Sequence, residues 1–140
     1  MVGASMAGMN AGAPVARHGP IRARREADGV LFRFDGVPTS AGPIARSMRA
    51  FVRKQGRWLR PRYGPFAVSL WANIDDRHRH IDIDNVTKAS LDALNGIVWH
   101  DDRQIVALAA YKQVALPERV IVFCRLADDD LPPAPDLDDA

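Results

Sequence analysis

Cysteine is almost absent from this chain of 140 residues, in which Cys124 is the single thiol. One thiol excludes an intramolecular disulfide and a zinc site built from several thiolates. Long apolar runs are also missing, because no stretch approaches the roughly 20 residues that cross a bilayer. Residues 1–16 lack the basic start and apolar centre of a secretory signal. We therefore expect a protein of a reducing compartment, the cytoplasm.

Acidic residues are scarce in the first half of the chain, and basic residues are missing from its end. Residues 1–62 hold twelve basic and three acidic residues, a net charge of +9, whereas residues 63–126 hold seven and eight, a net charge of −1. Residues 127–140 hold six acidic residues and no basic one. This asymmetry predicts a polyanionic partner for the first half and an acidic tail that competes with that partner.

The length and the 47% hydrophobic content are typical of one globular domain. Residues 1–28 are rich in Gly, Ala, Met and Arg without a hydrophobic period, which predicts a flexible N-terminal arm. Residues 127–140 combine aspartates with prolines, which predicts a disordered acidic tail. Residues 29–126 then form the folded domain.

Periodicity within this domain predicts four strands and two main helices. The strands are expected at 29–37, 66–74, 104–112 and 119–126, and the helices at 42–56 and 85–95, with a charged loop at 75–84. The order β-α-β-α-β-β indicates the α/β class, with a single-layer mixed sheet of about four strands carrying the helices. Cys124 and Trp99 are expected in the core.

Two kinds of side chain divide the surface of the first helix. Its apolar positions are Ile44, Met48, Phe51 and Val52, and its arginines are Arg46, Arg49, Arg53 and Arg57. At 100° per residue these sets fall on opposite faces. The arginine face is either a solvated surface or a contact for nucleic-acid phosphates, which position a protein without specifying sequence. The neighbouring aromatics Trp58 and Tyr63 favour the DNA contact.

The second half carries a pattern of acids around one lysine. If residues 81–84 are extended, Asp82 and Asp84 point the same way, and a divalent cation such as Mg²⁺ relieves their repulsion. Lys88 lies one helical turn beyond Asp84, and the pair Asp101-Asp102 is expected to supply a third carboxylate. Such a set suits hydrolysis of phosphodiesters, in which a metal activates water and a lysine stabilises charge.

Simpler interpretations of these acids stay open. Asp82 and Asp84 can cap a helix, because aspartate is favoured at helix starts. Asp92, four residues after Lys88, is more simply a structural partner of that lysine or a solvated charge.

The combined pattern resembles the RusA-type Holliday-junction resolvase family of bacteria and their phages. The similarity rests on Asp82-x-Asp84-Asn85-x-x-Lys88, on residues 91–96, and on Asp101-Asp102-x-Gln104, with Arg77 and Arg79 before it and Lys112 after it. It is dense from residue 75 to residue 112.

This resemblance implies a homodimeric, Mg²⁺-dependent endodeoxyribonuclease that resolves Holliday junctions by paired nicks during DNA recombination and repair. Asp82, Asp84 and Asp102 would be the catalytic metal ligands, Lys88 the essential lysine, and Asp101 the second acid of its pair. A homodimer suits the task because two identical sites address two symmetry-related strands. Arg77 and Arg79, with the arginines of the first helix, would bind the branched DNA.

Two alternatives from other classes are kept. One is a non-catalytic DNA-binding protein of the same fold, and the other is a metal-dependent enzyme acting on phosphoesters of nucleotides or sugars, in which a D-x-D pair also holds Mg²⁺.

Overall fold

A computed structural model of the chain describes residues 13–128 and 131–136. The expected arm and tail therefore fall partly outside the described residues, at 1–12, 129–130 and 137–140. Residues 131–136 of the tail contain neither helix nor strand.

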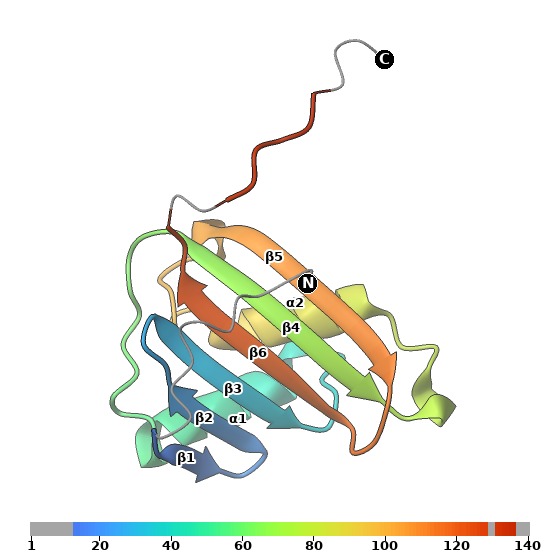
Figure 1. Cartoon of the computed structure of the whole chain (residues 1–140). Helices are drawn as coiled ribbons and strands as arrows, with labels where there is room; N and C mark the ends of the chain where they lie inside the picture. The colour runs from blue at the N-terminus through green and yellow to red at the C-terminus, as the bar shows by residue number, and fades with distance from the viewer. Residues whose placement is uncertain (1–12, 129–130, 137–140) are drawn as a thin grey trace.

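One mixed sheet organises the fold, and two helices cover one of its faces (Figure 1). The strands are β1 Val15–His18, β2 Ile21–Arg25, β3 Gly29–Asp35, β4 Phe66–Ile74, β5 Ile105–Val114 and β6 Arg119–Leu126. Their spatial order is β1-β2-β3-β6-β4-β5, with β4 and β5 parallel and all other neighbours antiparallel. The mixed α/β class with two main helices is confirmed, but the sheet has six strands rather than about four.

The two additional strands lie in the expected N-terminal arm, so this part of the prediction was wrong. Ile21 and Ala23 are buried, while Arg22 and Arg24, which alternate with them, lie on the other face of β2. Only two apolar residues alternate with the arginines, so the strand pattern is weak in the sequence. Antiparallel pairing with β3, for example of Ala23 with Phe32, stabilises the segment as a strand. Gly19, with a φ of +55°, forms the tight turn between β1 and β2.

The helices are α1 Ala41–Lys54 and α2 Ile83–Leu94, which also pack against each other. α1 turns Ile44, Met48 and Phe51 into the core. α2 begins two residues earlier than expected and ends before Gly96, whose φ of +79° suits the residue beyond a helix end. Short 3₁₀ turns, η1 at Asp76–His78 and η2 at Asp102–Gln104, precede α2 and β5.

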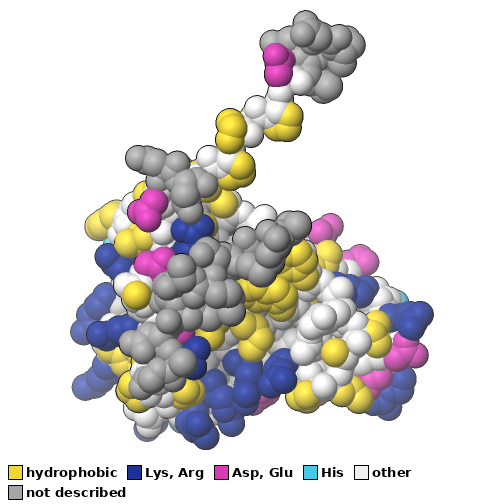
Figure 2. Space-filling view, viewed as in Figure 1, with side chains coloured by type: hydrophobic (Ala, Val, Ile, Leu, Met, Phe, Trp, Pro, Cys, Tyr) yellow, Lys and Arg dark blue, Asp and Glu magenta, His cyan; other side chains and the backbone are white. Residues whose placement is uncertain are grey.

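The core lies between the helices and the sheet. Its largest fully buried side chains include Phe32, Phe51, Leu70 and Trp99, and Cys124 is also buried as expected. The opposite face of the sheet carries the stacked rings of Trp71 and Tyr111, with centroids 6.0 Å apart. Figure 2 shows this face, where basic side chains gather around β1–β3 and apolar ones over the other half.

Candidate active site

The start of α2 places the first two acids differently from the expected extended segment. Asp82 is the N-cap residue with extended backbone, φ −76° and ψ 132°, and Asp84 lies in the first helical turn. Because a helix rotates about 100° per residue, the two carboxylates do not alternate as on a strand. Asp82 makes no side-chain capping hydrogen bond, so its carboxylate is not used to satisfy the helix end.

One face of α2 and the edge strand β5 enclose a concavity of about 460 Å³. Asp84, Lys88 and Asp92 line it at spacings of four residues, and Asp102 lines it from η2. With a rise of 1.5 Å per residue, successive members of the α2 row are about 6 Å apart along the axis. The fold therefore brings Asp84, Lys88 and Asp102 to one hollow.

The predicted gathering of three carboxylates is incomplete in this arrangement. Asp82 does not line the concavity, and no group of three or more His, Cys, Asp or Glu side chains within the described ranges is close enough to hold a metal ion. Asp82 lies outside because it precedes the helix whose one face carries Asp84 and Lys88. The assignment of the three aspartates as metal ligands stays a prediction.

Three of the charged groups on the α2 side of the concavity have no protein partner in the part of the chain that the structure describes. No side-chain hydrogen bond or ion pair there engages Asp84, Lys88 or Asp92, so the expected pairing of Asp92 with Lys88 is not formed. The hydroxyl oxygen of Thr87, on the same wall, is buried without a hydrogen-bond partner among the described residues. These groups remain available to a ligand.

Asp101 has a different role from its neighbour Asp102. Its carboxylate accepts hydrogen bonds from the guanidinium of Arg103 and then from the Arg103 backbone amide, which lower the pKa of Asp101 to about 2. Asp101 and Gln104 form a capping box at η2, in which each side chain accepts a hydrogen bond from the backbone amide of the other residue. Asp101 thus holds the turn that presents Asp102.

Gln104 is a positioning residue that the sequence interpretation missed. Its Oε1 accepts from the amides of His100 and Asp101, at 2.8 and 3.0 Å. Its Nε2 donates to the carbonyls of Arg62 and Gly64, at 2.8 and 2.9 Å. The spacing of an N-cap aspartate and a glutamine three residues later is a capping-box signal that would have indicated the local half of this network.

Lys112 performs a similar task for Asp82. From β5, its ammonium donates to the carbonyl oxygens of Arg79 and of Ile81, the latter at 2.7 Å. These two bonds tie the backbone just before Asp82 to the edge strand.

The basic residues predicted to bind DNA fall into two groups. Arg46, Arg49 and Arg53 are exposed on α1, opposite its buried side chains. Arg57 does not belong to this helical face, because α1 ends at Lys54 rather than near residue 56. Arg77 and Arg79 are paired within their own loop, with Asp75 and Asp76 respectively, so part of their charge is neutralised locally.

A family model, described as endodeoxyribonuclease RusA, matches residues 33–125. This range contains the acids, the lysine and the positioning residues described above. The chain belongs to the RusA family. Membership implies a Holliday-junction-resolving endonuclease, and it confirms the resemblance carried by the motifs around Asp82, Lys88 and Asp102.

Two further comparisons add little to the RusA assignment. No curated protein shows significant sequence similarity to the chain. Among solved structures, the periplasmic domain of Helicobacter pylori MotB, residues 90–256, is similar with a TM-score of 0.44 and 11% identity, covering 79% of this chain and 82% of that one. In the described ranges, no helix is both long and apolar enough to cross a membrane.

Proposed function

We propose that this protein is a Mg²⁺-dependent endonuclease that resolves four-way DNA junctions in recombination and repair. The observation that carries this proposal is the concavity that Asp84, Lys88 and Asp102 line together, inside the segment that matches the RusA family. Within the described ranges Asp84 and Lys88 form no side-chain hydrogen bond or ion pair, and Asp102 forms no ion pair, so their charge is available to a phosphodiester and a cation.

The donor set of this hollow fits a magnesium ion. Asp84 and Asp102 offer hard carboxylate oxygens, which Mg²⁺ prefers, and the unpartnered Thr87 hydroxyl can bond a coordinated water. Asp82, at the start of α2, would complete the ligands. When bound, Mg²⁺ lowers the pKa of water and neutralises negative charge on the phosphate.

The chain's own residues supply positioning and charge. Lys88 lies between Asp84 and Asp92 on the α2 face, where its ammonium can hold a phosphate oxygen and stabilise negative charge developing there. Asp101 and Gln104 fix the turn that carries Asp102, and Lys112 fixes the backbone that carries Asp82. These contacts hold the backbone that carries the acids in place before DNA binds. Less free energy is then needed to order the acids during the reaction.

The exposed arginines are proposed to hold the branched DNA. α1 and α2 lie on the same face of the sheet, so Arg46, Arg49 and Arg53 share a side of the molecule with the acidic concavity (Figure 1). Arg57, Arg77 and Arg79 extend the basic surface. Phosphate contacts of this kind position the duplex without reading its sequence. A homodimer would present two such sites to two symmetry-related strands.

Cleavage of a synthetic four-way junction in Mg²⁺ tests the proposal. Asp84→Asn, Asp102→Asn and Asp82→Asn should each lower the cleavage rate by at least about 100-fold while junction binding in Ca²⁺ is retained. Asp35→Asn removes one carboxylate, at the last residue of β3, that does not line the concavity, and serves as the control. Equal cleavage by the wild type and the Asp84→Asn variant would remove the concavity from the reaction.

One observation favours the second candidate, a DNA-binding protein of the same fold without turnover. Asp82 lies outside the concavity, and the described residues hold no preassembled group of three acids. That candidate predicts junction binding that weakens steeply with salt and no nicking with any divalent ion. Nicking by the wild type that is lost in Asp102→Asn would exclude it.

A further inference from the structure

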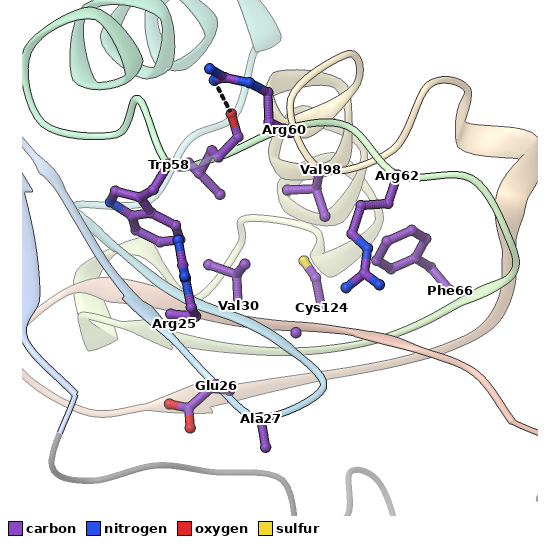
Figure 3. A pocket seen from close by; sticks show the side chains of 12 residues that line it. Arg25, Glu26, Ala27, Val30, Trp58, Arg60, Arg62, Phe66, Val98 and Cys124 are labelled. Atoms are coloured by element: carbon purple, nitrogen blue, oxygen red, sulfur yellow. Dashed lines mark hydrogen bonds between the residues drawn. The ribbon is translucent and has the colours of Figure 1, made fainter.

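A second cavity, of about 450 Å³, lies at the end of the sheet where β4 begins, and it shares no lining residue with the acidic concavity. The loop between α1 and β4 forms one wall, and the β2–β3 connection forms another (Figure 3). Its size lies in the range of small-ligand pockets.

The cavity combines an apolar floor with basic edges. Val30, Val98 and Cys124 lie at the floor, and Trp58 and Phe66 bring aromatic rings to its sides. Burial raises the pKa of the Cys124 thiol, so the floor carries no thiolate. This surface suits a flat, weakly polar ring.

Two guanidinium groups flank this space. Arg25 lies over the Trp58 ring, with its Cζ 5.1 Å from the ring centroid, and Arg62 extends into the cavity beside Phe66 (Figure 3). No side-chain hydrogen bond or ion pair within the described part of the chain engages either arginine. The one acid of the lining, Glu26, has a fully buried carboxylate bonded to Arg24 and points away from the space. The opening therefore favours an anion.

The wall of this cavity is joined to the candidate active site. Gln104 holds the carbonyl of Arg62 with one end of its amide and the backbone of Asp101 with the other. A ligand held by Arg62 is therefore held at a fixed position relative to the turn that presents Asp102. A flat ring, a nearby anion and a fixed relation to a DNA-cutting site are the properties of one nucleotide of the substrate strand.

We propose that this cavity binds an unpaired nucleotide of the DNA strand, with its base over the apolar floor and aromatic walls and its phosphate on Arg25 and Arg62. The inference rests on the proposed function, because it names which part of the branched DNA the protein holds beside the cleavage site. Stacking on aromatic and guanidinium groups is tolerant of base identity, so the cavity selects unpaired structure rather than sequence.

Binding of labelled pentathymidylate to the full chain in EDTA tests this inference. Arg62→Gln should weaken binding about tenfold, and Trp58→Leu by a similar factor, as expected for losing one phosphate contact or one stacked base. Arg60→Gln is the matched control. Arg60 also belongs to the lining and carries the same charge, but its guanidinium turns away from the cavity to the carbonyls of Arg57 and Leu59. This control should change binding less than about threefold.

Fluorescence of 2-aminopurine placed beside the branch point reports base stacking, which does not depend on the overall charge of the protein. The 2-aminopurine fluorescence should change by the same amount when the wild type or Arg60→Gln binds the junction. It should stay unchanged when Arg62→Gln binds. Equal behaviour of Arg62→Gln and Arg60→Gln in both assays would overturn the inference. Deoxythymidine monophosphate binding as tightly as pentathymidylate would also overturn it, because the site would then serve free nucleotides.

Junction cleavage separates this failure from failure of the proposed function. If the wild type cleaves the junction while all variants bind pentathymidylate equally, the cavity assignment fails and the nuclease stands. If the wild type cleaves nothing while Arg62→Gln selectively loses pentathymidylate, the nuclease assignment fails and the nucleotide site stands.

Discussion

Gln104 joins two segments about 40 residues apart through both ends of one side chain. A neutral amide suits this position because one end must accept from amides and the other must donate to carbonyls. Glutamine is therefore required by the hydrogen bonds on both sides of its amide. The capping-box motif around Asp101 indicates only the bonds to nearby residues and not those to Arg62 and Gly64.

Gln104→Glu is predicted to destabilise the fold by about 2–3 kcal/mol at neutral pH. The substitution keeps the size of the side chain, but its carboxylate cannot donate to the carbonyls of Arg62 and Gly64 and is repelled by them. Urea unfolding measures the loss. Gln113→Glu is the control, because Gln113 is exposed and, among the described residues, its side chain donates one hydrogen bond, to Asn73. Similar midpoints for the two variants would contradict the linking role of Gln104.

Gly29 is required by close packing of two strands. A Cβ at this position would lie 1.9 Å from the carbonyl oxygen of Cys124 and 2.8 Å from Cα of Arg125. Gly29→Ala should therefore lower the free energy of unfolding by about 2 kcal/mol or more, because β3 and β6 must separate locally. Gly42→Ala is the control: its Cβ would meet only the Arg46 guanidinium at 3.6 Å in α1, so stability should be unchanged or slightly higher. Thermal unfolding of both variants decides the point.

The α1 helix separates burial from charge over its whole length. Ile44, Met48 and Phe51 hold it against the sheet, so its arginine face is presented as a rigid row. Phosphates along a duplex are also regularly spaced, which makes such a row an effective electrostatic contact.

The triple substitution Arg46, Arg49 and Arg53 to Gln should reduce the slope of log K against log salt concentration by about 2.7 if each arginine contacts a phosphate. The matched control is Arg17, Arg22 and Arg33 to Gln, three neighbours across β1–β3 on the other face of the sheet. Filter binding of duplex DNA over a salt series measures both slopes. If the salt dependence of binding is weaker in the control variant than in the α1 variant, more phosphate contacts were lost from the open face of the sheet. The DNA would then bind that face rather than α1.

The 3₁₀ turn before α2 is fastened by Glu118. Its carboxylate accepts from the Asp75 amide and from Nδ1 of His78, each at 2.8 Å. The hydrogen bond with His78, then that from the Asp75 backbone, lowers the pKa of Glu118 below its ordinary value of 4.5.

This lowered pKa predicts a pH-dependent contribution of Glu118 to stability. A carboxyl group with a depressed pKa in the folded state stabilises the fold above its unfolded pKa, and the contribution is lost as pH falls through the folded pKa. The difference in unfolding free energy between wild type and Glu118→Gln should be full at about pH 6 and should shrink below about pH 4. A difference that stays constant with pH would assign the effect to packing alone.

At the scale of the whole molecule, charge is divided along the chain as well as between its faces. The first 62 residues carry +9 and the last 14 carry −6, so an intramolecular attraction can compete with DNA. Deleting residues 128–140 should tighten binding to non-specific duplex DNA at low salt, and the gain should disappear at high salt as screening increases. Fluorescence anisotropy at two salt concentrations checks this, and equal affinities at low salt would end the idea.

The fold was predictable where hydrophobic pattern and burial agree. β4 and β6 occupy the expected ranges 66–74 and 119–126, because their residues are apolar enough to be central strands. β1 and β2 were missed because few apolar residues alternate with their arginines, so the local pattern is too weak to predict a strand. Their strand conformation depends on pairing with each other and with β3. α2 starts earlier than expected because Asp82 takes the N-cap position, so Ile83 and Asp84 lie in the first helical turn rather than in an extended segment.

Sequence alone determined the local chemistry: the order of acids and lysine, the amphipathic face of α1 and membership of the RusA family. These depend on spacing along the chain, which periodicity and motifs record directly. Tertiary structure decided which acids line one hollow: Asp84 and Asp102 do, and Asp82 does not. It also decided that Arg25 and Arg62 flank one cavity and that Gln104 joins that cavity to the acids. Such groupings follow from packing between segments tens of residues apart, and no local pattern contains that information.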